Sequence, residues 1–161
     1  MLTSRRPKAL LDSALATGAL ATIATGGALI GLGIREGESS RVFRLVGRTL
    51  LERIGVASAA APLTSVAVGY LHHLIVATGW GVVLGMIVLA LRGPVRLFAA
   101  LLATVAYGLI ALWFMPPVIR IGFSVTNNVA SVVPIGVALL VALLGGVWLA
   151  ASDSGTQSSV T

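Results

Sequence analysis

The sequence predicts an all-α membrane protein, a polytopic four-helix bundle with one interfacial amphipathic helix. Three observations support this prediction. Of the 161 residues, 57% are hydrophobic and 10% are charged, whereas a soluble domain is usually about 25% charged. Four apolar stretches of spanning length occupy most of the chain, and small residues recur along them every four positions. The chain has no cysteine, which excludes disulfides and thiolate metal sites.

Four membrane spans are predicted, each close to the 20 or so apolar residues that cross a bilayer. They cover about residues 9–34, 66–91, 95–114 and 129–151. A basic leader, residues 1–8, precedes the first span, whose apolar run exceeds the ~7–15 residues of a signal-peptide core. We therefore expect a transmembrane helix there rather than a cleaved signal. Residues 152–161 form a polar tail that we expect to be disordered.

An amphipathic helix is predicted between the first two spans, at about residues 41–54. Arg41, Arg44 and Arg48 share one helical side with Glu52, and apolar residues occupy the rest. This pattern favours a helix in the headgroup plane, with its arginines on lipid headgroups and its apolar side in the acyl chains. The alternative is a solvated linker helix packed on the bundle.

Small residues at four-residue spacing predict where helices approach one another, because a groove without large side chains lets two backbones come close. The predicted packing positions are Gly27 and Gly31 in the first span, Gly81 and Gly85 in the second, and Ala138, Ala142 and Gly146 in the fourth.

The second span contains both histidines of the chain, His72 and His73. On a helix, consecutive side chains point about 100° apart, so the two rings do not easily face one site. A polar group inside the membrane is a functional hypothesis by default. One interpretation is an axial ligand to a haem or chlorophyll-type macrocycle, with Met86, Met115 or a partner subunit as the second ligand. The favoured interpretation is a hydrogen bond across a helix interface, without a cofactor.

Arg120 follows the Pro116–Pro117 break and has two interpretations. In a partly re-entrant segment it would meet an anionic substrate or lipid, as in transporters with broken helices. The favoured interpretation is an arginine that snorkels to phosphate headgroups. The chain carries a net charge of +6, and its basic residues lie at segment ends and in one connection. This suits anionic lipid rather than nucleic acid.

The sequence contains no recognisable set of catalytic residues. The five acidic residues are Asp12, Glu36, Glu38, Glu52 and Asp153, and only Asp12 falls within a predicted span. No carboxylate pair lies near the histidines, and no phosphate-binding loop or metal-ligand spacing is present. We therefore expect neither an enzyme nor a metal site.

Two runs, GYLHHLIVATGWGVVLG and AYGLIALWFMPPVI, carry a resemblance that covers the second and third predicted spans. They resemble small four-helix bacterial integral membrane proteins of unassigned function. The resemblance implies a membrane location and a compact bundle. It implies no activity and assigns no functional residue.

The sequence thus predicts a non-enzymatic accessory or assembly subunit of a membrane complex, or a homo-oligomer. Expected partners are membrane lipid and other membrane subunits or a second copy. Two alternatives remain: a haem- or pigment-binding subunit that uses His72 or His73, and a small transporter or channel. The expected location is the plasma (inner) membrane, multi-pass. The basic leader and the short turn from Arg92 to Arg96 favour cytoplasmic termini.

Overall fold

The computed structural model describes residues 7–56, 61–113 and 129–156, and this part of the chain is entirely helical outside its turns. The helices are α1 (Pro7–Arg35), α2 (Arg41–Arg53), α3 (Pro62–Ala90), α4 (Val95–Trp113) and α6 (Val129–Thr156). Three of them have segments long and apolar enough to cross a membrane: Lys8–Arg35, Pro62–Ala90 and Val132–Ser152. This confirms the all-α prediction and the presence of helices of membrane-spanning character. α4 carries a shorter apolar segment, Val95–Ile110.

Two helix ends differ from the prediction. α3 begins at Pro62 rather than near residue 66, since a proline in the first helical turn needs no backbone hydrogen-bond donor there. α6 continues to Thr156, so the first residues of the predicted polar tail are helical. Between helices the chain turns at Gly37, Gly55 and Gly93, which have φ angles of 93°, 77° and 61°. A side chain at these angles would be strained, which explains glycine at these three turns.

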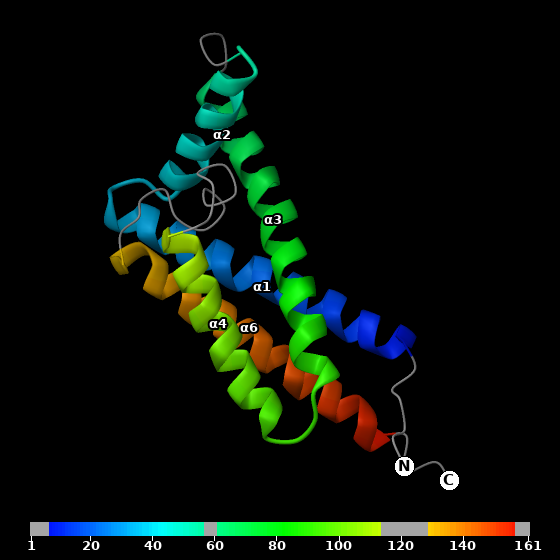
Figure 1. Ribbon diagram of the computed structural model, residues 1–161. Coiled ribbons are helices and arrows are strands. Elements are labelled where there is room, and N and C mark those ends of the chain that lie inside the picture. The colour runs from blue at the N-terminus through cyan, green and yellow to red at the C-terminus, as the bar shows by residue number, and fades with distance from the viewer. Residues whose placement is uncertain (1–6, 57–60, 114–128, 157–161) are drawn as a thin grey trace.

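α1 lies at the centre of the arrangement (Figure 1). It crosses α3 and packs along α6, and α4 packs mainly on α6. α3 and α4 also meet through Trp80 and Tyr107, whose ring centres lie 5.6 Å apart in an edge-to-face contact. Consecutive long helices run in opposite directions, so the start of α1 and the end of α6 lie on the same side (Figure 1).

α2 packs against the first half of α3, at the opposite end from the α3–α4 turn (Figure 1). Its apolar side chains are buried there: Val42, Phe43, Val46 and Leu51. The predicted burial of this face in acyl chains is therefore wrong, and the alternative of a helix packed on its neighbour describes the observed contact. The reason is that α3 offers Ser65 and Gly69 as a smooth surface onto which α2 fits.

Large apolar side chains point outward, while several polar side chains are buried. Leu71, Ile75 and Ile87 on α3 are more than half exposed, whereas Thr25 and His73 are almost fully enclosed. A soluble monomer rarely exposes so continuous an apolar surface. The inverted distribution suits helices whose outer surface meets hydrocarbon.

Candidate functional site at the crossing of α1 and α3

His73 lies where α3 crosses α1, and its side chain is 2% exposed. Its Nε2 atom is 3.3 Å from the backbone oxygen of Thr22 and 3.5 Å from Oγ1 of Thr25, both on α1. The ring sits in one row with Gly69 and Ala77, which are also buried. The histidine therefore joins two of the helices that have membrane-spanning character.

The contact with Thr22 fixes which nitrogen of His73 carries a proton. A backbone oxygen only accepts, so Nε2 must be the donor in this hydrogen bond. The hydroxyl of Thr25 donates to the backbone oxygen of Ala21 at 2.6 Å, which leaves its oxygen free to accept a second, longer contact from Nε2. In this state the Nε2 lone pair is not available to coordinate a metal or a haem iron.

Three helices enclose the imidazole. A methyl group added at Gly26 of α1 would lie 3.3 Å from Nε2, so the α1 backbone is close to the ring. On α2, Phe43 meets His73 edge to face with ring centres 5.7 Å apart, and it meets Tyr70 in the same manner at 5.5 Å. A flat macrocycle on Nε2 would have to displace α1. This arrangement suits a structural histidine.

His72 lies on a different face of α3 from His73. Its side chain is half-buried, and the contacts that enclose His73 come from other residues. The two histidines therefore do not combine into one site, as their helical offset predicts.

A second polar contact joins the same helices about one turn away. The hydroxyl oxygens of Thr22 on α1 and Thr78 on α3 are 2.8 Å apart. Thr22 also donates to the backbone oxygen of Gly18 at 3.0 Å, so its own proton is used. Thr78 must then be the donor to Thr22. The crossing carries two hydrogen-bonded contacts in addition to its apolar packing.

Glycines make the close approach of the helices to α1 feasible. A methyl group at Gly81 would lie 2.6 Å from the Cβ atom of Ala21, and one at Gly85 would lie 3.1 Å from the Cβ atom of Thr17. On α6, a methyl group at Gly146 would overlap the hydroxyl of Thr17. The structure thus places Gly81, Gly85 and Gly146 at contacts with α1.

The remaining predicted packing positions divide into two groups. On α6, Ala142 is buried and Ala138 is half-buried. On α1, Gly27 and Gly31 are exposed, and a methyl group at either would meet no described atom within 4 Å. No described residue of this chain covers these two glycines, so the prediction that they receive a neighbouring helix stays a prediction.

The crossing is formed by a row of α1 that the sequence pattern did not single out. It consists of small or hydroxyl-bearing residues four positions apart, all of them buried: Ala14, Gly18, Thr22 and Gly26. Gly26 is adjacent to Gly27 in sequence but about 100° away around the helix, which separates the inner face from the outer one. The sequence did contain a signal for this row. Thr22 lies between Gly18 and Gly26, and glycines together with a hydrogen-bonding side chain are typical of interfaces between membrane helices.

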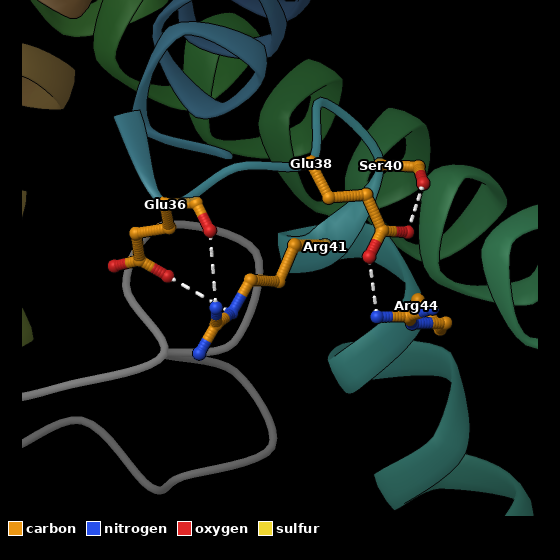
Figure 2. A network of polar contacts seen from close by, with 5 residues as sticks. All are labelled: Glu36, Glu38, Ser40, Arg41 and Arg44. Carbon is orange, nitrogen blue, oxygen red and sulfur yellow. Dashed lines mark hydrogen bonds and ion pairs between the residues drawn. The ribbon is translucent and has the colours of Figure 1, made fainter. Parts of the chain in front are cut away.

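Two arginines in the first turn of α2 meet glutamates of the connection from α1 (Figure 2). Arg41 pairs with Glu36 at 3.1 Å, and Arg44 pairs with Glu38 at 2.5 Å; Ser40 donates to the same carboxylate at 2.7 Å. Arg48 pairs with Glu52 at 2.9 Å. The first two of these ion pairs link α2 to the corner that follows α1. Arg120 lies outside the described residues, so its role stays a prediction.

The described acidic side chains do not gather around His73. Within residues 7–56, 61–113 and 129–156, no three His, Asp or Glu side chains gather as metal ligands. The glutamates lie at the α1–α2 corner and on α2, paired with arginines, rather than beside His73. No family model, curated protein or solved structure matches this chain.

Proposed function

We propose that the chain is a non-enzymatic integral membrane protein that serves as an accessory or assembly subunit, either as a homo-oligomer or within a larger membrane complex. One observation carries this proposal: the buried polar groups at the α1–α3 crossing join helices, while large apolar side chains face outward. Because the polar groups join helices within the bundle, the apolar outer surface is left to contact other membrane helices.

We include α4 as a fourth span. Its 19 residues give a length of about 28 Å, close to the ~30 Å hydrocarbon core. Its outer side chains are apolar and more than half exposed at Phe98, Leu102 and Leu109. Four spans place both ends of the described chain on one side, and the basic leader supports the cytoplasmic side of the plasma (inner) membrane.

The docking surface that we propose is the outer face of α1 around Gly27 and Gly31. Exposed Ile23, Ile30 and Ile34 flank the two glycines. A Gly-x-x-x-Gly strip with apolar borders allows a second helix to approach backbone to backbone. Because no helix of this chain fills it within the described residues, a second copy or another subunit is the occupant that we propose.

Native mass spectrometry in mild detergent tests the proposal. We expect an oligomer or a defined complex from the wild-type chain, and its loss in the Gly27→Leu/Gly31→Leu variant. Gly79→Leu is the matched control, since Gly79 is also exposed on a membrane helix without a neighbour within 4 Å. A monomer in both the wild type and the variant, with no co-purifying subunit, would refute the docking role.

The pigment-binding alternative would use His72 or the Nδ1 atom of His73, because Nε2 of His73 donates to Thr22. The absorption spectrum of the purified protein separates the alternatives. A Soret-type band that disappears in His72→Ala or in His73→Ala would favour pigment binding, whereas a featureless visible spectrum favours the structural role.

A further inference from the structure

The position of α2 restricts how far the hydrocarbon core extends along α3. α2 lies beside the stretch of α3 from Ser65 to His73, where Gly47 meets Ser65 and Phe43 meets His73. The arginine side chains on the side of α2 that faces away from α3 are exposed, and that of Arg48 is 70% exposed. Charged side chains facing acyl chains are costly. α2 and the adjoining turns of α3 therefore lie at the edge of the hydrocarbon core or outside it.

The rest of α3 is long enough to cross the core without these turns. Residues 74–90 make 17 helical positions, or about 26 Å, close to the ~30 Å core. His73 then marks the boundary of the hydrocarbon core. The stretch from Pro62 to His73, together with α2, forms a two-helix unit at the membrane surface, which we call the surface hairpin.

One side of the surface hairpin is an apolar ridge. Leu63, Ala67 and Leu71 are exposed and lie four positions apart, about 200° around α3 from the row that α2 covers. The two leucines supply most of its apolar surface, and they are 78% and 58% exposed. The same ridge continues without a break through Ile75 into the spanning part of the helix. Leu71 therefore lies at the acyl-chain boundary, whereas Leu63, about 12 Å further along the axis of the same helix, lies beyond it on the headgroup side.

The opposite side of the surface hairpin carries excess positive charge. α2 and the corner that leads into it, residues 35–53, contain five arginines and three glutamates, a net charge of +2. The ion pairs of this segment join side chains that are 36–70% exposed, and exposed pairs stabilise a protein only weakly. Phosphate accepts two parallel hydrogen bonds from a guanidinium, so it competes well with these carboxylates.

From these observations we propose that the surface hairpin binds the anionic lipid headgroups of the membrane in which the chain is embedded. The Leu71 end of the ridge lies at the acyl-chain boundary, and the arginines of α2 contact lipid phosphates. The close contact of Gly47 with Ser65, and of Gly69 with Phe43, holds the two sides together as one unit. The inference rests on the proposed membrane location but not on docking to a partner subunit.

Depth measurements test the placement, and the absence of cysteine allows single spin labels. Leu45→Cys reports the arginine side, Leu71→Cys the ridge, and Ile87→Cys the spanning part. In vesicles of phosphatidylcholine and phosphatidylglycerol, we expect oxygen to reach the labels at 71 and 87, and a water-soluble nickel chelate to reach the label at 45.

Chelate access at 71 with oxygen access at 87 overturns this inference alone. Chelate access at 87 overturns the membrane location as well. Spin–spin broadening at 71 means that a second copy covers the ridge, which also overturns the inference.

Arg48→Gln and Glu52→Gln form a matched pair for the charge contribution, because each removes one partner of the same ion pair. The readout is the phosphatidylglycerol retained per protein after mild extraction from mixed vesicles. We expect about fivefold less in Arg48→Gln, since one arginine near an anionic surface contributes ~1 kcal/mol, and more than wild type in Glu52→Gln. A purely structural role shifts both variants in the same direction, and that result, or no change in either, overturns the proposal.

Discussion

The side chain of Thr17 on α1 occupies the space that Gly146 on α6 leaves empty. A methyl group at Gly146 would overlap the Thr17 hydroxyl, which donates to the backbone oxygen of Ser13 at 2.8 Å. Thr17 is also close to Gly85 of α3. One threonine of the central helix thus contacts both neighbouring helices.

We expect Gly146→Ala to destabilise the bundle by about 1–3 kcal/mol, because overfilling a packed contact forces helices apart. Unfolding in a mixed-detergent titration measures this change. Adding Thr17→Ala should restore part of the loss by removing the atoms in conflict. Gly136→Ala is the control, since the added methyl group would meet its nearest atom at an ordinary 3.8 Å. Equal losses in the two alanine variants would contradict the assigned contact.

We expect His73→Ala to lower the free energy of unfolding by about 1–3 kcal/mol, because it leaves a cavity and removes the donor to Thr22. His72→Ala should cost less, because the side chain is only half-buried. Thermal unfolding in detergent, followed by circular dichroism, compares the two variants. A larger loss in His72→Ala would show that the imidazole of His73 is not the one that holds the crossing together.

We expect Gly47→Ala and Gly69→Ala to detach α2 from α3. The added methyl groups would overlap the backbone oxygens of Ser65 and Phe43, and backbone cannot rotate away as a flexible side chain does. Protease sensitivity and hydrogen exchange of α2 measure the detachment. Gly79→Ala on the same α3 should be neutral or slightly stabilising, since alanine favours a helix over glycine by ~1 kcal/mol and Gly79 has open space. Unchanged protection of α2 in both alanine variants would refute this contact.

A double-mutant cycle on Thr22 and Thr78 should give a coupling energy of about 0.6 kcal/mol and at most ~1.7 kcal/mol, the mean and the maximum for hydrogen bonds between membrane helices. Thr→Val changes preserve the side-chain shape while removing the 2.8 Å contact. Each single variant, the double variant and the wild type are compared by unfolding in the same detergent. A coupling energy near zero would mean that the two hydroxyls do not interact in the folded protein.

The order of the apolar segments determined much of the fold. Spans of about 20 apolar residues must satisfy their backbone groups internally, so a helix is predicted wherever such a span occurs. The periodicity of arginines at positions 41, 44 and 48 likewise predicted α2 and its charged side. Glycines at Gly81 and Gly85 predicted where another helix comes close.

Tertiary structure alone decided which neighbour each face meets. Gly26 and Gly27 are adjacent in sequence, yet Gly26 contacts His73 while Gly27 faces outward. Small-residue spacing marks a face that permits close packing, but the helix that fills it depends on how all the helices cross. The same reason explains α2: its periodicity required an apolar surface to cover Phe43, and only the crossing at Gly47 and Gly69 made that surface α3 rather than lipid.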